Sequence, residues 1–540
     1  MSDQEARRTG IMYGSKVPTL WLDYVSGQGV TSDGAHATPK IGRGRKTPNL
    51  TDMLDMAHSY GAKRIMLTGN VPTLRNDVRA WLLVQTPGWK PLGHRVKEPP
   101  VGRFQHAQTG HRVDVRLVSE WFDDPLTPSQ ARDAWNVTES VVQSINERQY
   151  LLYSPSRTGL SLWWSSLPKT KDRKLIIPAH VSQDIADDLH RTSGQQHVEH
   201  LVAGPNFTAH PDALPLIDPK TTPKLSTFTY IDGRFMYAAM GRELGVGPGI
   251  RLNRAAAYER ITEDPYARAW YEVRFTVPQD WHHIGILGVQ HENPEDGWFY
   301  PNRPGATHIT WADSAEVAVA IAHGWLIEPL QGIVFQKARP LDNFMAAINR
   351  ARENVEQNQD LPRPLRRAVV GALRSLLIQT VGALASRGGT KTMVADSLAD
   401  VPPESAADAV QHGKVYVYEA PGDRREIANY HPELSVQVWG RARARLLRAP
   451  TAQALDGGGV LALPGHSIIG VQGDAVYTTE VPAWSLPTAH GGGDDGKTGR
   501  LRIKGTITGN YATPATIQDR DRLKARTEKA GPSAAWTKGE

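Results

Sequence analysis

A strand-like run that ends in a carboxylate constrains this 540-residue chain more than any other feature. Phe228 and Tyr230 belong to an alternating apolar run that leads to Asp232, and aliphatic and aromatic residues follow up to Met240. Such a run predicts a strand that delivers the carboxylate to its tip before the chain turns. A carboxylate placed there can hold a metal ion, and Tyr237 can close the floor of a sugar pocket. The pattern therefore suits a phosphoryl-transfer site.

A second carboxylate stands at the turn of an expected hairpin. Ser467 to Glu480 is typical of two strands joined by a tight turn, with Gly473 and Asp474 at the turn. Either acid alone has an ordinary structural explanation, because aspartate is a common turn residue. The two become informative together only if the fold brings them to one place.

Composition narrows the class of protein without assigning a function. Hydrophobic residues make up 40% and charged residues 22% of the chain, which is typical of a globular protein with about two to four domains. Cysteine is absent, which excludes disulfides and thiolate chemistry and fits a cytoplasmic protein. The polar N-terminus predicts no signal peptide, and Arg374 and Gln379 within the apolar segment 369–385 predict a buried helix, not a membrane span. A net charge of +6 is compatible with a polyanionic partner.

The residues after the hairpin and between the two acids complete a pattern that resembles family B DNA polymerases. Residues 229–240 resemble their motif A, Asp-x-x-Ser-Leu-Tyr-Pro, with Asp232, Tyr237 and Met240 in register. The hairpin resembles their motif C, Tyr-x-Asp-Thr-Asp-Ser, with Asp474 at the second acid and Gln472 in place of the first. In order and spacing the match covers about residues 225 to 510 and is closest to the protein-primed phage and plasmid enzymes, whose insertion between motifs A and B matches residues 298–324.

A helical segment and a basic segment extend this resemblance. Residues 374–386 resemble motif B, Lys-x-x-x-Asn-Ser-x-Tyr-Gly, with Arg374 at the lysine and Gly382 in register, although the asparagine, serine and tyrosine are replaced. Residues 499–505, including Arg502 and Lys504, stand where the family carries a basic element that touches the primer terminus. Motifs B and C are thus degenerate.

The resemblance implies an α+β and α/β multidomain fold, in which a polymerase palm of antiparallel sheet plus helices joins helical fingers and an N-terminal exonuclease-like or other α/β domain. We expect six segments: 1–150 as the N-terminal domain, 151–225 as a connecting region, 226–340 and 391–510 as the two parts of the palm, 341–390 as the fingers, and 511–540 as a charged tail. In the N-terminal domain, Asp23 would match the first exonuclease acid, but Val25 replaces the glutamate that should follow.

The resemblance also implies roles for individual residues. Asp232 and Asp474 would be catalytic, and with the carbonyl of Gly233 they would bind Mg²⁺ or Mn²⁺. Tyr237 would lie under the sugar of the incoming nucleotide and favour deoxynucleotides, and Arg374 would meet its triphosphate. The DNA-binding residues would be Lys504 and Arg502. The implied partners are a DNA template and primer, dNTPs and a terminal protein primer, with no membrane.

These implications lead to the hypothesis of template-directed DNA synthesis in phage or plasmid replication. A second hypothesis is a catalytically inactive, polymerase-like protein that binds DNA in replication or at telomeres. A third is an unrelated α/β enzyme, which predicts that Asp232 and Asp474 lie far apart. Two further segments have ordinary interpretations: the arginines at 441–448 as a solvated helix face and residues 197–200 as surface.

Overall fold

The computed structural model of the protein describes residues 12–71, 85–96, 101–192, 198–205, 207, 210–293, 296–386, 390–421 and 427–535. Contacts divide the chain into two compact units. The first unit combines Met1–Ser166 with Arg350–Tyr430, and the second combines Leu167–Asn349 with His431–Glu540. Both units mix sheets with helices, so the predicted α/β multidomain class is confirmed. The finer division into six segments remains a prediction.

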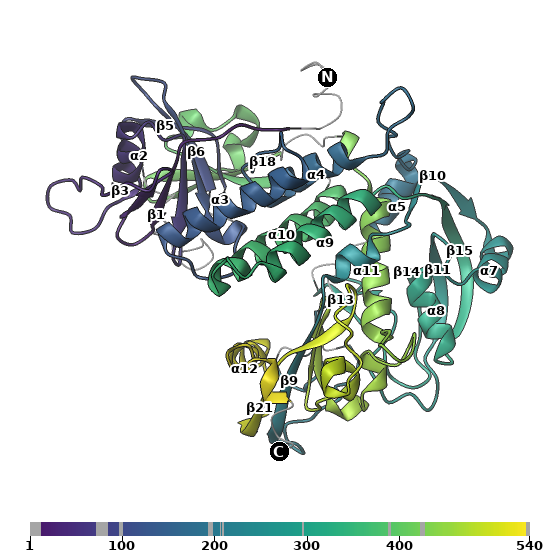
Figure 1. Ribbon diagram of the computed structural model, residues 1–540. Coiled ribbons are helices and arrows are strands. Elements are labelled where there is room, and N and C mark those ends of the chain that lie inside the picture. Colours follow the sequence, from purple (N-terminus) through teal and green to yellow (C-terminus); the bar gives the residue numbers. More distant parts are fainter. Residues whose placement is uncertain are drawn as a thin grey trace. The chain divides into compact units, whose positions relative to one another are not determined.

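A seven-stranded sheet forms the centre of the first unit, in the order β3-β2-β1-β4-β7-β6-β5 (Figure 1). The three central strands β1, β4 and β7 run parallel, whereas all other neighbours pair antiparallel. The strands are β1 (Thr19–Asp23), β2 (Gly29–Thr31), β3 (His36–Ala37), β4 (Arg64–Thr68), β5 (Trp89–Val96), β6 (Val101–His106) and β7 (Arg112–Leu117).

Helices cover both faces of this sheet. Alternate side chains of β1 point in opposite directions, and since they are apolar on both faces, each face has to be covered. Leu20 and Leu22 pack with residues of α2 (Leu50–Ser59) in one apolar cluster. Trp21 points to the other face, where its ring centroid lies 5.4 Å from that of Trp135 on α3 (Pro128–Ile145). The sheet therefore has an apolar core on each side.

Two long helices and a small sheet complete the first unit. α4 (Pro155–Ser166) and α10 (Arg363–Leu384) approach so closely that a Cβ on Gly159 would lie 1.8 Å from Thr380 Oγ1. In the described part of the chain, α10 alone is long and apolar enough to cross a membrane, but half of its apolar window is buried inside the structure. Its packing agrees with the buried helix that the sequence predicts. The small sheet has the order β16-β18-β17, with β16 (Thr390–Ala395), β17 (Val410–His412) and β18 (Val415–Pro421).

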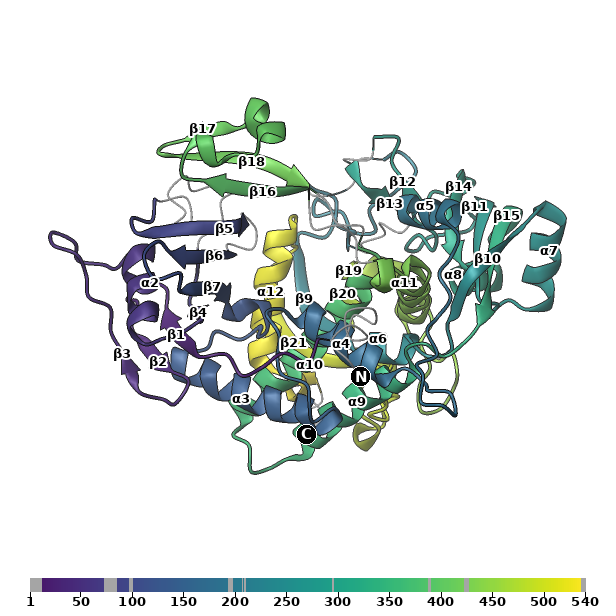
Figure 2. The same cartoon turned by 90° about the horizontal axis from the view of Figure 1, so that it is seen from above.

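An antiparallel five-stranded sheet organises the second unit, in the order β21-β9-β20-β19-β8. Its strands come from three distant parts of the sequence: β8 (Val198–His200), β9 (Lys224–Gly233), β19 (Ile468–Gln472), β20 (Ala475–Thr478) and β21 (Leu501–Ala512). Figures 1 and 2 both show α12 (Ile517–Ala530) beside β9 and β21. Phe228 and Tyr230 of β9 pack there with Leu523 of α12. The segment predicted as a charged tail thus contains a helix that closes one face of the sheet.

A second antiparallel sheet of this unit has the order β10-β15-β11-β14. Its strands are β10 (Gly245–Leu252), β11 (Ala269–Thr276), β14 (Thr307–Asp313) and β15 (Leu326–Lys337), and β12 (Val289–Gln290) pairs separately with β13 (Trp298–Phe299). The helices of the unit are α5 (Gln183–Thr192), α6 (Met236–Met240), α7 (Arg254–Glu263), α8 (Ser314–Ala322) and α11 (Pro432–Leu447), while α9 (Asp342–Gln357) leads into the first unit.

Helix α11 is buried along most of its length, which corrects two predictions from the sequence. Arg443 is fully buried and donates to Glu199 Oε1 at 2.5 Å and to the carbonyl of Gly285 at 2.8 Å. The arginines at 441–448 are therefore not a fully solvated face, because Arg443 is buried and Arg441, Arg445 and Arg448 are half-buried, and Glu199 and His200 are not surface residues. Helical periodicity and local polarity do not report which other elements enclose a helix, and here the enclosing strand β8 lies more than 200 residues away in the sequence.

A buried carboxylate pair begins helix α8 where it meets α11. Asp313 and Glu316 form a capping box, and a Cβ on Gly440 of α11 would lie 2.3 Å from Asp313 Cβ. Burial raises the pKa of Glu316 to about 8, with the nearby Asp313 carboxylate adding to the effect, and burial raises the pKa of Asp313 to about 6. In the folded protein both acids therefore keep their protons to a higher pH than in the unfolded chain, and at neutral pH Glu316 is mainly protonated.

Replacing Glu316 should weaken the pH dependence of stability. A raised pKa means that the unfolded chain releases this proton at lower pH than the folded chain does, so stability is lost as pH rises from about 4.5 to about 8. In Glu316→Gln, whose amide stays neutral, this loss should shrink by an amount on the order of a few kcal/mol. Thermal unfolding from pH 5 to pH 8.5 measures it, with exposed Glu263→Gln as the control. Equal pH dependence in the native and Glu316→Gln proteins would contradict this assignment.

Candidate active site

Asp232 lies one residue before the end of β9, the second strand of the five-stranded sheet. Its register partners are Ala475 on β20 and Arg502 on β21, so strands flank it on both sides. The side chain is almost fully buried. Since β9 alternates Phe228, Tyr230 and Asp232 on one face, the carboxylate continues an apolar row that α12 covers further along.

Asp474 occupies the second position of the two-residue turn between β19 and β20. Gly473 takes the first position with φ of 60°, a conformation that suits glycine in such turns. The backbone N–H of Gly233 donates to the carbonyl of Asp474 at 3.1 Å, which ties the hairpin turn to the end of β9. The two acids that the sequence singles out are thus brought to the same edge of the sheet. The large separation expected for an unrelated enzyme is not found.

Gly233 leaves the space that the carboxylate of Asp474 occupies. An ideal Cβ at this position would lie 2.4 Å from Asp474 Oδ2 and 2.9 Å from the Cβ of Met236. Any side chain here would displace one of these groups, because real Cβ atoms do not approach so closely. The glycine therefore permits Asp474 to lie directly against the end of the strand that carries Asp232.

Tyr237 lies on the short helix α6 immediately after this turn. Its ring packs edge-on against Trp439 of α11, with centroids 4.9 Å apart, and its hydroxyl lies 3.4 Å from the Cβ position of Gly473. Phe235, which precedes the helix, has φ of 49°, a left-handed conformation that is costly for a bulky residue. The chain therefore makes a strained turn that carries Tyr237 beneath the hairpin of Asp474.

The two predicted DNA-binding residues lie on β21, the neighbour of β9. Lys504 Nζ is 3.8 Å from Asp232 Oδ2, and about a third of the lysine side chain is exposed. The register shifts between Ile503 and Gly505, which makes Lys504 the extra residue of a bulge. Arg502 pairs with Asp232 across the strands. The structure therefore places a cation at the carboxylate edge, whereas Arg374 lies half-buried on α10 in the first unit.

The loop before β21 holds the turn after β9, a feature that the sequence analysis missed. Arg234 donates its backbone N–H to the carbonyl of Arg500 at 2.7 Å, and its guanidinium pairs with the buried carboxylate of Asp494 at 2.8 Å. Arg500 in turn forms a bidentate pair with Asp495. The sequence does show an Asp-Asp pair, Asp494 and Asp495, in a glycine-rich stretch. No local pattern identifies the arginines with which these acids pair.

The residue at the first acid position of the hairpin is also engaged within the sheet. Gln472 Oε1 accepts from Arg520 of α12 at 3.1 Å and from the hydroxyl of Tyr477 at 3.3 Å. Arg520 is fully buried and stacks over the ring of Tyr477. Gln472 therefore anchors α12 to the sheet instead of supplying a carboxylate.

The donor set at this edge fits a hard divalent cation. Mg²⁺ is commonly held by one or two carboxylates, with the remaining positions filled by water and substrate phosphates. Asp232 near the end of β9 and Asp474 in the turn before β20 supply two carboxylates at this edge, and the backbone N–H of Gly233 donates to the carbonyl of Asp474. Among the described residues no group of three or more histidine, aspartate or glutamate side chains could hold a metal, so a closed, all-protein metal cage is not built there.

In the first unit, Asp23 lies at the end of β1 and caps the turn that follows. Its Oδ1 accepts from the backbone N–H of Ser26 at 2.8 Å, from the Ser26 hydroxyl and from the backbone N–H of Val25. These contacts give the aspartate a structural role in the turn. An exonuclease role for the first unit remains a prediction.

Comparison with solved structures identifies proteins with a similar fold. No family model matches the chain, and no curated protein matches it. Among solved structures, Phi29 DNA polymerase in an orthorhombic crystal form has a TM-score of 0.51 at 10% sequence identity, over 85% of this chain and 79% of that chain. Its complexes with single-stranded DNA and with primer-template DNA each reach a TM-score of 0.53, at 9% and 10% identity, over 91% of this chain and 85% of those chains. The protein therefore shares its overall fold with Phi29 DNA polymerase.

Proposed function

We propose that the protein is a template-directed DNA polymerase that adds deoxynucleotides to a 3′-hydroxyl or to a protein primer. The observation that carries the proposal is the junction of Asp232 and Asp474 at one edge of an antiparallel sheet, in a chain with the fold of a DNA polymerase. The proposed setting, from the resemblance to protein-primed enzymes, is phage or plasmid replication. A DNA template, a DNA or protein primer and dNTPs are its proposed partners.

Each residue of the candidate site would then have a chemical task. Asp232 and Asp474 would hold Mg²⁺ or Mn²⁺, and the bound ions would stabilise the charge on the attacking and leaving oxygens. Gly233, which has no side chain, leaves room for the Asp474 carboxylate against the end of the strand that carries Asp232. Lys504, 3.8 Å from Asp232, carries the positive charge that would draw the primer phosphates to this edge, with Arg502 beside it.

Two further roles concern the incoming nucleotide. Tyr237 is held by Trp439 beneath the Asp474 turn, where a rigid ring would exclude a 2′-hydroxyl. Arg374 on α10 is proposed to meet the triphosphate, a task for which its planar guanidinium is suited. Both assignments rest on the resemblance of motifs A and B.

Neutralising either acid should abolish nucleotide incorporation. In Asp232→Asn and Asp474→Asn the shape is kept but the charge that binds the cation is lost. Because even outer partners of metal ligands contribute about 10–100-fold, the loss should exceed about 100-fold. Extension of a labelled primer with Mg²⁺ and with Mn²⁺ measures it, and exposed Asp280→Asn provides the control. Variants that retain native incorporation would refute the assignment of these two carboxylates.

Adding one methyl group at Gly233 should lower the rate without unfolding the protein. The Cβ of Gly233→Ala would meet Asp474 Oδ2 and Met236, so the carboxylate must move by more than half an ångström. Because a misplacement of about 1 Å can cost about 100-fold in rate, we expect a 10- to 100-fold fall in kcat. Gly371→Ala, on a helix with open space around it, is the matched control. An unchanged kcat with Gly233→Ala would show that Asp474 is not positioned by this contact.

Shortening Tyr237 should relax the choice of sugar. Tyr237→Val removes the ring beneath the turn, so ribonucleotides should be incorporated at least about tenfold better relative to deoxynucleotides. Tyr237→Phe, which keeps the ring, should discriminate as the native protein does. Single-nucleotide extension with paired dNTP and NTP substrates gives both ratios. The same loss of discrimination in the two variants would assign the effect to the hydroxyl, against this proposal.

A catalytically inactive DNA-binding protein is the second candidate, and the contacts of Gln472 favour it. This side chain stands where the resemblance expects an acid, and it is committed to Arg520 and Tyr477. A protein that has lost one carboxylate and uses the position to secure α12 could keep DNA binding without synthesis. DNA binding with no incorporation by the native protein, from a DNA or a protein primer, would support this second function.

A further inference from the structure

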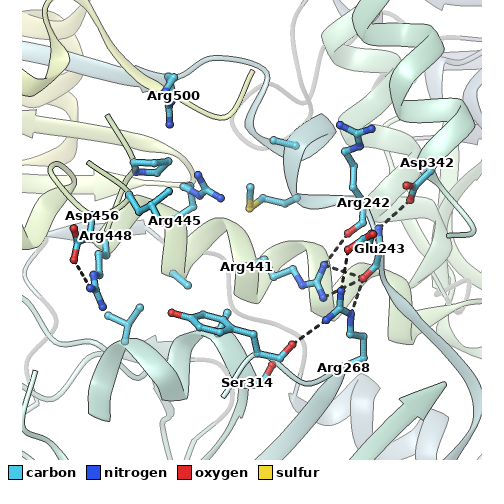
Figure 3. A pocket seen from close by; sticks show the side chains of 18 of the residues that line it. Arg242, Glu243, Arg268, Ser314, Asp342, Arg441, Arg445, Arg448, Asp456 and Arg500 are labelled. Atoms are coloured by element: carbon cyan, nitrogen blue, oxygen red, sulfur yellow. Dashed lines mark hydrogen bonds and ion pairs between the residues drawn. The ribbon is translucent and has the colours of Figure 1, made fainter. Parts of the chain in front are cut away.

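A large cavity of the second unit is lined by arginines and lies apart from the two acids. Its volume is about 1140 Å³, and α6, the start of α8, α11 and the loop at 448–456 surround it (Figure 3). Seven arginines and three carboxylates line it, so its walls carry an excess of four positive charges. Neither Asp232 nor Asp474 is among the lining residues. The cavity is thus a cationic site distinct from the candidate active site.

Four of these arginines are balanced by carboxylates. Arg268 and Arg339 both pair with Glu243, and Figure 3 shows the Arg268 pair at the edge of the cavity. Arg448 pairs with Asp456, and Arg500 with Asp495. These pairs fix the walls of the cavity, although Arg268 and Arg339 share a single carboxylate.

The other three arginines have no carboxylate partner among the described residues. Arg441 donates to the backbone carbonyls of Arg242 and Glu243, which orients its guanidinium without neutralising it. The guanidinium groups of Arg242 and Arg445 form no hydrogen bond or ion pair with any described residue. Arg445 is half-buried, and burial together with the nearby Arg500 lowers its pKa. Burial and the nearby cation make the charged form of Arg445 costly in free energy. An anion that enters the cavity would lower this cost.

The cavity also presents an exposed aromatic ring. Tyr266 lines it and is 59% exposed, and Leu455 at its rim is 90% exposed. Guanidinium forks match the geometry of phosphate, and nucleic-acid bases stack on exposed aromatic rings. Cations beside a stacking ring are the combination by which proteins hold single-stranded nucleic acid. The volume exceeds that of a typical small-molecule site, about 300–1,000 Å³, so a segment longer than one nucleotide fits.

We propose that this arginine cavity binds the phosphates of a single-stranded nucleic-acid segment, with Arg242 and Arg445 as ligands and Tyr266 as a stacking platform. The choice of nucleic acid as the ligand rests on the proposed function. The cavity would add to that function a contact with a nucleic-acid strand away from the two carboxylates. The cavity and the acids are connected through α6, which carries Tyr237 and contributes Ala239 and Met240 to the cavity wall. Arg500 also links them, since its carbonyl accepts from the residue after Gly233.

The test measures the salt dependence of binding to a labelled dT20 oligonucleotide by fluorescence anisotropy, with the full chain. Single-stranded binding loses about 0.7 in the slope of log K against log salt for each phosphate contact removed. The double variant Arg242→Ala/Arg445→Ala should therefore lower this slope by about 1.4 and raise the Kd about tenfold or more at low salt. Arg254→Ala/Arg274→Ala, which removes two exposed arginines outside the cavity, should leave the slope near the native value.

Three further variants separate ligand binding from folding. Arg242→Lys/Arg445→Lys keeps the charge, so it should preserve the slope while losing the bidentate fit. Tyr266→Ser should weaken oligonucleotide binding, and Tyr266→Phe should not. Equal slopes for the native protein and the double alanine variant, with melting temperatures unchanged, would overturn the proposal. Failure of the native protein to bind labelled dT20, together with binding of a labelled decaglutamate peptide that the double alanine variant loses, would overturn it too, since that result identifies an acidic peptide as the ligand.

The outcome is separable from that of the proposed function. Binding is measured without nucleotide incorporation, so a protein that synthesises no DNA but shows the predicted slope change still has the site. A protein that extends primers, but whose double alanine variant binds dT20 with the native slope and affinity, lacks it. Inorganic tripolyphosphate identifies the source of the phosphate groups: weaker competition per phosphate than dT20 supports a strand, and equal competition overturns it in favour of a free polyphosphate.

Discussion

The second unit depends on one constraint, the placement of β9 between β20 and β21. Because β9 pairs antiparallel with both, residues near 232, 475 and 502 are forced into one row across three strands. A slip of one residue in either ladder would turn Asp232 to the opposite face. The register is fixed by the packing of Phe228 and Tyr230 against Tyr477 and Leu523, which rewards only one alternation. The position of the carboxylate edge is therefore a consequence of how the core packs.

The candidate site could be predicted in part because two of its features are local. A strand that ends at Asp232 and a tight turn at Gly473-Asp474 are visible in alternation and turn residues, and the structure places both as expected. The close approach of the Asp474 carboxylate to Gly233, 2.4 Å from an ideal Cβ at that position, could not be predicted. It joins residues that are more than 200 positions apart in the sequence. The same holds for Arg234 with Asp494, which are 260 positions apart, and the contact of Arg520 with Gln472 over 48 positions is likewise invisible to local patterns.

The fold was likewise predictable where periodicity sufficed. The buried helix expected from the apolar segment 369–385 belongs to α10, and the hairpin expected at 467–480 is β19 with β20. Predictions failed where an element is enclosed by distant parts of the chain. The sequence predicts that the polar face of α11 is exposed to solvent, yet Arg443 is buried against Glu199 of β8. The charged sequence of α12 gives no sign that Leu523 completes the core beneath β9. Local charge therefore misleads when long-range ion pairs satisfy it.

The distribution of cations in the second unit follows a physical logic. At the sheet edge, Lys504 faces Asp232, so much of its charge is already balanced in the ligand-free protein. In the arginine cavity, Arg445 lies near Arg500, and desolvation raises the cost of keeping Arg445 charged. Folding does not select for unbalanced charge, because neutral residues of similar size would pack there at lower cost. A cluster that destabilises the free protein persists when an anionic ligand offsets the repulsion. The proposed binding of phosphate groups therefore gives a physical reason for a cluster that folding alone does not favour.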